Sequence, residues 1–424
     1  MIETPLRDSS FTSSLRRYWA WAQKGSWVVM DQALFAGANF LGGLMLARWL
    51  TPTADGAFST AYTVFLLVGT LHNALWIDPM TVYGSGRFRE NYIEYQRILL
   101  NYHWRFGVVA FGVFALIGAG LLALGQGALG RSFLGLAIAS SLILFLWLAR
   151  RGAYVAMMPR LATYGGVLYL VLYLGMTAAL ERLNWLNETS ALVTMGLASW
   201  ISGRWILIYG RRATMSSIEI SPVETASLHW EYGRWALLSA FFSWAPANLL
   251  FLLLPFFENL DNVGGLRAML TIFQPPIQVN SALSAMLVTI YATLASSKSK
   301  KRLTLVAASA LGALNVIYCA LIILFGHQIV TAIMPRYDGY VDVFKFPLAI
   351  LTIFTAFIGV FMSFFKSLEK PQTVTRVMLF AAIFSAILSA TILPLGGAVG
   401  AAWVMTATYA LITFNFFWRW TREA

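Results

Sequence analysis

A polar stripe runs along the segment 263–292, which is otherwise apolar and long enough to cross a bilayer, since a spanning helix needs about 20 apolar residues. Spacings of four, three, four and three residues separate its members, which are Arg267, Thr271, Gln274, Gln278 and Ser281. At about 100° per residue these side chains fall on one face of a helix. A polar face inside a membrane is turned toward a water-filled cavity or toward other helices.

The stripe therefore has two interpretations. Thr, Gln and Ser side chains join helices in many membrane bundles. An arginine does not suit that role, because placing it deep in a bilayer costs about 2.5–3.5 kcal/mol on insertion scales. Arg267 favours a cavity that receives an anion, although its position near the helix start also allows it to snorkel to the surface. Pro275 and Pro276, within the stripe, predict a bend or break in this helix.

The composition excludes a soluble protein. Of the 424 residues, 59% are hydrophobic and 11% are charged, and the mean hydropathy is +0.69. These values predict an all-α integral membrane protein. The net charge of +12 comes from basic residues that are spread over short loops, which argues against nucleic-acid binding. The only cysteine, Cys319, excludes an internal disulfide.

Twelve transmembrane helices are predicted, and their short connections leave no room for a soluble catalytic domain. The spans lie near residues 27–48, 57–82, 105–125, 132–149, 161–180, 190–209, 235–257, 265–292, 303–325, 345–365, 373–393 and 397–418. They divide the chain into an N-terminal segment 1–26, a six-helix bundle 27–212, a linker 213–234 and a second six-helix bundle 235–424. The first segment is interpreted either as a short helix on the membrane surface or as a disordered tail.

The distribution of Lys and Arg predicts the orientation. The connections after odd-numbered spans carry few basic residues, whereas the N-terminal segment and the connections after even-numbered spans, such as 298–302, carry many. Basic loops stay in the cytoplasm. We therefore expect both termini and the linker to be cytoplasmic.

An internal repeat supports two equivalent halves. When residues 53–65 are aligned with 261–273, identical or similar residues recur in the same register. The matched pairs are Gly56 with Gly264, Thr63 with Thr271, Phe65 with Phe273, Thr70 with Gln278, and Asn73 with Ser281. Both segments start from the same side, so the repeat is parallel and relates the bundles by a pseudo-two-fold axis along the membrane normal. Such a repeat places a cavity between the halves.

Four stretches of the chain carry a resemblance to a known family. They are 47–52 with Asp55 and Gly56, 266–268 with the later Gln-Pro, 365–371, and 396–402. The chain resembles the Wzx-type polysaccharide flippases of the multidrug/oligosaccharidyl-lipid/polysaccharide exporter superfamily over nearly its whole length. The resemblance implies two bundles that work by alternating access in the bacterial plasma (inner) membrane. The implied cargo is an undecaprenyl-diphosphate-linked oligosaccharide, and a polysaccharide polymerase and glycosyltransferases are the implied protein partners.

Binding residues for such a cargo follow from its chemistry. A diphosphate needs the donors of Arg or Lys, and Arg267, Arg204 and Arg48 are the candidates. Arg204 also suits snorkelling at a cytoplasmic end, and Arg48 also suits an interfacial anchor at the end of a span. The remaining members of the predicted substrate-binding set are Thr271, Gln274, Gln278, Ser281 and Asn73.

An acidic residue in the first span takes part in cation coupling in the drug-exporting branch of the superfamily. Asp31 resembles that position loosely, and Asn39 lies on roughly the same helix face. An ion pair between Asp31 and Lys24 or a cytoplasmic Arg is the alternative. Asp78, which precedes Pro79, is predicted to end or kink its helix.

Two other functions stay in competition with the flippase. A multidrug or toxin cation antiporter favours an acidic, aromatic cavity, whereas this one is predicted to be basic. A non-transporting scaffold of a polysaccharide assembly complex leaves the repeated stripe unexplained. The four histidines lack metal-ligand spacing and the spans hold no plausible catalytic triad. We therefore expect no enzyme activity, metal or cofactor.

Overall fold

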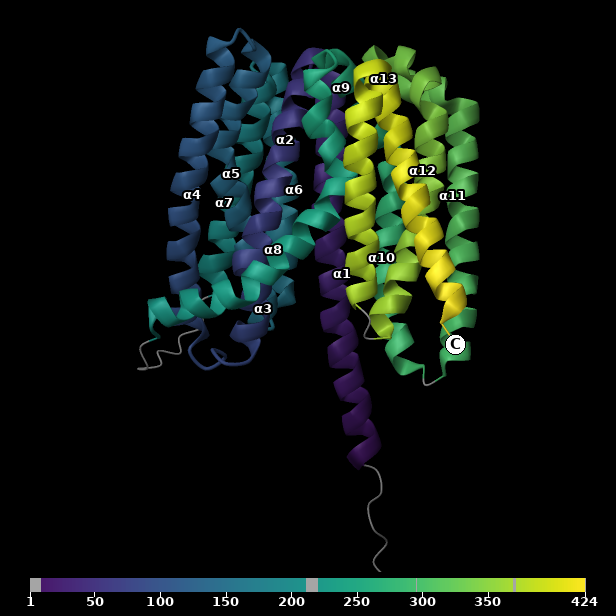
Figure 1. Ribbon diagram of the computed structural model, residues 1–424. Coiled ribbons are helices and arrows are strands. Elements are labelled where there is room, and N and C mark those ends of the chain that lie inside the picture. The colour runs from purple at the N-terminus through teal and green to yellow at the C-terminus, as the bar shows by residue number, and fades with distance from the viewer. Residues whose placement is uncertain (1–8, 211–219, 295, 369–370, 424) are drawn as a thin grey trace, which may run out of the picture.

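The computed structural model of the protein describes residues 9–210, 220–294, 296–368 and 371–423, and it contains two helical bundles (Figure 1). The first is built from α1 (Ser9–Trp49), α2 (Pro52–His72), the π-helix η1 (Asn73–Ile77), α3 (Asp78–Ser85), α4 (Tyr92–Ala123), α5 (Gly127–Val155), α6 (Pro159–Arg182) and α7 (Glu188–Gly210). The second is built from α8 (Pro222–Leu253), the 3-10 turn η2 (Leu254–Phe256), α9 (Leu260–Ile272), α10 (Gln274–Thr293), α11 (Ser297–Ile333), the 3-10 turn η3 (Pro335–Tyr340), α12 (Val341–Ser367) and α13 (Pro371–Arg422).

The two bundles point in the same direction. Helices α2 and α9 both begin at the end that lies at the top of Figure 1, which we call the closed end. The helical chain starts and finishes at the opposite end, which we call the terminal end. The parallel repeat that the sequence predicts is therefore present in the fold.

Each bundle has its own core. Phe65, Leu136 and Leu144 belong to the buried cluster of the first bundle, whereas Phe344 and Leu348 belong to that of the second. Lipid is as apolar as these side chains, so the helices associate through close packing of small residues. For example, a Cβ atom on Gly196 of α7 would stand 2.9 Å from the Cα atom of Ala139 on α5.

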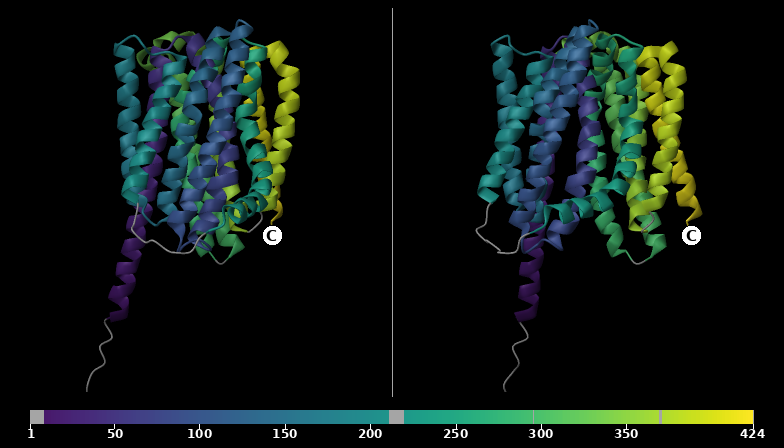
Figure 2. Two further views of the ribbon diagram at one scale, coloured as in Figure 1. Left: turned by 90° about the vertical axis from the view of Figure 1, so that its left-hand side faces the viewer. Right: turned by 60° about the vertical axis from the view of Figure 1, so that its left-hand side comes forward.

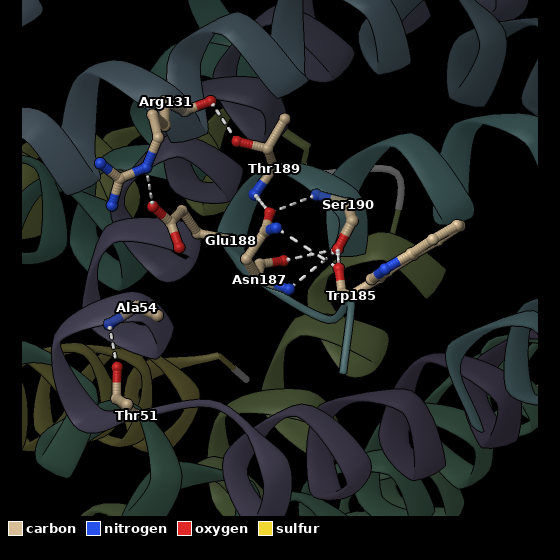
Figure 3. A network of polar contacts seen from close by, with 8 residues as sticks. All are labelled: Thr51, Ala54, Arg131, Trp185, Asn187, Glu188, Thr189 and Ser190. Atoms are coloured by element: carbon tan, nitrogen blue, oxygen red, sulfur yellow. Dashed lines mark hydrogen bonds and ion pairs between the residues drawn. The ribbon is translucent and has the colours of Figure 1, made fainter. Parts of the chain in front are cut away.

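Helix starts at the closed end are fixed by side chains (Figure 3). Asn187 accepts hydrogen bonds from the backbone N–H groups of Thr189 (3.0 Å) and Ser190 (2.9 Å), as residues that cap a helix do. The neighbouring Glu188 is buried and pairs with Arg131 of α5 at 2.7 Å. One of the few basic residues at this end is therefore neutralised within the protein.

Proline and glycine produce the main breaks. Pro275 and Pro276 occupy the first turn of α10, and the helix is interrupted at Phe273, which confirms the break predicted from the sequence. Gly397 has φ of +49°, and α13 folds back there into two arms (Figure 1). Helix α8 bends by 73° between the segments 236–246 and 248–256, next to Pro246.

The described residues form eight helices that are long and apolar enough to cross a membrane, and α8 adds a ninth if its bent halves count as one span. One of the eight is α13, whose two arms correspond to the last two predicted spans. Helix α1 and the interrupted pair α9–α10 supply the first and the eighth predicted spans. The twelve-helix architecture in two bundles thus agrees with the sequence prediction.

The segment before the first span differs from its prediction. Helix α1 continues without a break from Ser9 to Trp49, and its first part projects beyond the bundles along the direction of the span in all views (Figures 1 and 2). It is therefore not a separate helix lying across the membrane surface. Residues 1–8 and 211–219, which belong to the predicted N-terminal segment, the end of the predicted first bundle and the predicted linker, lie outside the described residues.

Helix α8 begins inside the predicted linker and packs beneath the first bundle. His229 is buried there, accepts a hydrogen bond from the hydroxyl of Tyr95 (2.6 Å) and donates one to the carbonyl of Leu75 in η1 (2.9 Å). Burial lowers the pKa of this imidazole, and the bond to Leu75 opposes that shift. The start of α8 is thereby attached to the π-helix of the opposite bundle.

Candidate functional site

Arg267 lies on α9 where the two bundles face each other. Its guanidinium stands 5.6 Å from the ring of Phe251, and its charge acts on Asp55 and Tyr62 of α2 in the first bundle. The side chain makes no hydrogen bond or ion pair with any residue in the described part of the chain. A half-buried guanidinium with free donors is costly in a protein interior. These donors are available for an anion.

Asp55 is the main member of the site that was not among the residues predicted from the sequence. Its side chain is only 4% exposed, and its Oδ2 atom accepts a hydrogen bond from the hydroxyl of Tyr337 at 2.9 Å. Asp55 belongs to the first bundle, whereas Tyr337 and Arg267 belong to the second. A carboxylate before Gly56 in an apolar span was the available signal, but only the fold reveals its partners.

The predicted stripe divides at the break between α9 and α10. The hydroxyl of Thr271 donates to the carbonyl of Arg267 (3.0 Å), and its methyl group faces Gly43 of α1. Gln278 donates to Gln274 at 3.3 Å. Gln278 and Ser281 are exposed on α10, together with the apolar Val279 and Leu283. The polar face is therefore continuous from Arg267 to Thr271, whereas the exposed surface of α10 beyond Gln274 carries both polar and apolar side chains.

A second polar region lies nearer the terminal end. Thr70, Asn73 and Asp78 line a cavity of about 380 Å³ together with Ala240 and Trp244 of α8. Asn73 belongs to the predicted binding set, whereas Asp78 was predicted only to end or kink its helix. The chain does change there: η1 ends at Ile77, and Pro79 lies in the first turn of α3.

Arg48 contacts the end of a helix in the opposite bundle. Its Nη1 atom donates to the carbonyls of Ala332 (3.1 Å) and Ile333 (3.4 Å), which end α11. Arg336 makes the reciprocal contact, because its Nη1 atom donates to the carbonyls of Trp49 (2.8 Å) and Leu50 (2.6 Å) at the end of α1. Arginine side chains at helix C-termini stabilise the free carbonyls. The two arginines thus join the bundles at the closed end.

Arg204 lies on the outer side of the first bundle. It is exposed on α7 and shares its helix face with Leu197, Trp200, Ile201 and Ile208, which are also exposed. Helix α7 packs against α5 and α6 on its other side. An apolar exposed face of this kind suits lipid, so the position of Arg204 favours the snorkelling alternative.

Asp31 is fully buried in an ion pair inside the first bundle. Its Oδ2 atom stands 2.6 Å from Nη2 of Arg150, and the hydroxyl of Tyr154 also donates to it. The partner is thus one of the basic residues of a predicted cytoplasmic loop. Asn39 lies two turns further along α1 and accepts a hydrogen bond from the hydroxyl of Tyr169 at 3.1 Å.

Solved structures of transporters share this arrangement. An inward-facing multidrug resistance MATE family transporter of the MOP superfamily matches with a TM-score of 0.75 and 13% identity over 93% of this chain and 96% of that one. The chain has the fold of MOP superfamily transporters. The lipid II flippase MurJ, in an inward closed conformation, matches with a TM-score of 0.72 and 10% identity over 94% and 87% of the two chains.

An outward-facing MATE family transporter gives a TM-score of 0.66, with 13% identity over 95% of this chain and 97% of that one. The likeness is thus greater to the inward-facing MATE structure than to the outward-facing one. No family model and no curated protein matches the sequence. At these identities the likeness establishes the fold alone.

Proposed function

We propose that the protein is a flippase that moves an undecaprenyl-diphosphate-linked oligosaccharide across the bacterial inner membrane by alternating access. The observation that carries this proposal is the guanidinium of Arg267, which lies between the bundles without a hydrogen-bond partner among the described residues. A diphosphate offers the oxygens that such a guanidinium binds in a bidentate manner. The lipid tail of the cargo stays in the bilayer while its polar head passes between the bundles.

The fold supports a transport cycle of this kind. One of the similar structures is a flippase for lipid II, and two others are MATE transporters in inward- and outward-facing conformations. In our proposal the closed end faces outward and the terminal end faces the cytoplasm, as the Lys and Arg distribution predicts. The contacts of Arg48 and Arg336 would then separate when the outward-facing state forms.

The proposed site is smaller than the set predicted from the sequence. We assign the diphosphate to Arg267 and place Thr271 beside it. Arg48 serves as a contact between the bundles, and Arg204 as a lipid-facing residue. Gln274, Gln278 and Ser281 are assigned to the path of the sugar along α10. We assign Asp31 to a buried ion pair instead of ion coupling, and Asn39 to a hydrogen bond with Tyr169.

The antiporter alternative needs a free carboxylate in the central site. Asp55 is the carboxylate on which the charge of Arg267 acts. It is not free, because it accepts a hydrogen bond from Tyr337 and has this arginine as a cationic neighbour. Arg267 would repel a cationic drug at this level of the cavity. The site therefore favours an anionic cargo.

Complementation of a strain that lacks the gene tests the proposal. Arg267→Ala should restore less than about a tenth of the parent's surface polysaccharide, because a charged hydrogen bond contributes about 1.5–3 kcal/mol. Arg267→Lys should restore an intermediate amount, since the charge remains and the bidentate geometry is lost. Arg204→Ala is the matched control and should restore the parent's level. Each variant must reach the membrane in normal amount.

Full restoration by Arg267→Ala would remove the anionic-site argument. Resistance to cationic dyes in place of polysaccharide would establish the exporter alternative. A scaffold would be indicated by a different result. Deletion of the protein would then abolish the activity of a polymerase or glycosyltransferase, whereas the Arg267→Ala variant would preserve that activity.

A further inference from the structure

The cavity between η1 and α8 contains polar groups that no residue of the described chain satisfies. Trp244 is 6% exposed, and its indole N–H has no hydrogen-bond partner there. The side chains of Asn73 and Asp78 also lack hydrogen bonds to the described residues. The charge of Arg151 acts on Asp78 without an ion pair between them. Thr70 donates its proton to the carbonyl of Leu66 and keeps its oxygen as an acceptor.

The π-helix explains why these groups converge. Asn73 and Asp78 are five residues apart, and in an α-helix they would point to different sides. In η1 the backbone N–H of Asp78 bonds to the carbonyl of Asn73, which is the i→i+5 pattern of a π-turn. The wider turn brings residues i and i+5 to the same side. Short π segments of this type are frequent at functional sites.

Contacts from α8 hold the π-helix in place. His229 donates to the carbonyl of Leu75 inside η1. Gly233, one turn later, lets α8 approach closely, because a Cβ atom there would stand 3.1 Å from the carbonyl oxygen of Ala74. One wall of the cavity therefore comes from η1 and its neighbours in the first bundle and the other from α8 in the second. The two walls contact each other directly.

The donor and acceptor pattern of the cavity selects its ligand. The indole only donates, the carboxylate only accepts, and the amide of Asn73 does both. A phosphate or acidic sugar would be repelled by Asp78, and a cation would leave the indole N–H without an acceptor. Hydroxyl groups both donate and accept, so a neutral sugar can satisfy all three side chains.

We propose that Asn73, Asp78 and Trp244 form a subsite for an uncharged hexopyranose of the cargo, separate from the diphosphate site at Arg267. The inference rests on the proposed function. Tyr62, which is close to Arg267, and Thr70 are eight residues apart on α2, which corresponds to about 12 Å along the helix. A diphosphate and the sugar attached to it can bridge that distance.

Binding to the purified full-length protein in lipid nanodiscs tests the subsite. The probes are undecaprenyl diphosphate and the same lipid with one glucose or one galactose attached. For the parent protein we expect at least one of the sugar-bearing probes to bind about tenfold more tightly than the bare lipid. Asp78→Asn and Trp244→Phe should each reduce that ratio to about twofold or less and leave the affinity for bare undecaprenyl diphosphate unchanged.

Two controls separate this inference from the proposed function. Trp200→Phe, on the exposed face of α7, should preserve the ratio. Arg267→Ala should weaken binding of all probes by a common factor and preserve the ratio as well. If Arg267→Ala changes none of the affinities, the assignment of the diphosphate to Arg267 is wrong. The ratio of the affinities for the sugar-bearing and bare lipids still tests the subsite in that case.

Three results would overturn the subsite. One is equal affinity of the parent protein for the bare lipid and both sugar-bearing probes. Another is a ratio that neither Asp78→Asn nor Trp244→Phe changes. The third is competition between the sugar-bearing lipid and tetraphenylphosphonium that Asp78→Asn abolishes, because the cavity would then be a cation site.

Discussion

Gly56 and Gly264, which are equivalent positions of the two sequence halves, lie against each other where α2 and α9 cross. A Cβ atom on Gly56 would overlap the carbonyl oxygen of Leu260, and one on Gly264 would stand 2.5 Å from the carbonyl oxygen of Pro52. Equivalent residues meet only near the axis that relates two halves, as in a two-fold interface. The closed end is therefore built around the pseudo-two-fold axis.

Alanine at either glycine should destabilise the closed end. We expect Gly56→Ala and Gly264→Ala each to lower the free energy of unfolding by about 1–3 kcal/mol, because the added methyl group overpacks a backbone contact. Thermal unfolding of the purified protein measures the effect. Gly37→Ala is the control, since nothing lies within 4 Å of its added Cβ atom. Equal midpoints for all three variants would contradict the tight crossing.

A disulfide across the axis should trap one conformation. Thr53 donates a hydrogen bond to Asp261 at 2.5 Å, and these residues are also equivalent in the repeat. In a Cys319→Ala background, oxidation of Thr53→Cys/Asp261→Cys should join the bundles and stop polysaccharide export, because the closed end can no longer separate. Reductant should restore export, and neither single cysteine variant should respond. Continued export by the cross-linked protein would mean that this end does not open.

Loss of one partner of the ion pair between Asp31 and Arg150 should destabilise the folded protein. Removal of one partner leaves the other charge buried and unpaired, so we expect Asp31→Asn to lower the free energy of unfolding by about 3–5 kcal/mol. Arg150→Met combined with Asp31→Asn should recover much of that loss. Unfolding midpoints and export are measured together. If Asp31→Asn keeps its stability but loses export driven by an ion gradient, Asp31 is an ion-coupling residue.

Thiol accessibility should distinguish the faces of α9 and α10. In a protein without Cys319, we expect cysteines at Arg267, Thr271, Gln274 and Gln278 to react with a membrane-impermeant reagent from at least one side. Leu270 is 6% exposed and Ile277 packs against the core of the second bundle, so cysteines at these two positions should react several-fold more slowly. The rates of labelling in membrane vesicles measure the difference. Similar rates at all six positions would contradict the prediction that this polar face lines an aqueous cavity.

Reporter fusions should establish the orientation. Residues 129 and 261 lie at the starts of α5 and α9 at the closed end, whereas residue 299 lies at the start of α11 at the terminal end. We expect fusions after 129 and 261 to report the external side and a fusion after 299 to report the cytoplasm. Paired phosphatase and fluorescent-protein fusions provide the measurement. A cytoplasmic signal after 261 would contradict the proposed orientation of the repeat.

Local patterns in the sequence were enough to predict the architecture. Hydropathy located the spans because each helix in a bilayer satisfies its own backbone hydrogen bonds within a fixed length. Pro275 and Pro276 located the break between α9 and α10, because proline lacks a backbone donor. The register of the repeat followed from single matched residues, and Gly56 with Gly264 proved to be a contact as well.

The sites depended on relations between helices, which a single sequence does not contain. The rotation of α7 put Arg204 on the outer face, and the π-turn at η1 shifted Asp78 to the side of Asn73. A prediction with a uniform period of 3.6 residues per turn misses such a shift. His72 of α2 and His103 of α4, which are 31 residues apart, meet at 3.0 Å between ring nitrogens because their helices pack together, and the sequence gives no sign of this contact.

The sequence by itself thus determined the class, the spans and the parallel repeat of this protein, because hydropathy, helix breakers and register are properties of contiguous residues. The tertiary structure alone decided which charges are paired. Asp31 meets Arg150, Asp55 meets Tyr337, and Arg48 meets the end of α11, whereas Arg267 keeps its donors free among the described residues. The physical reason is that pairing depends on how helices distant in the sequence pack against one another.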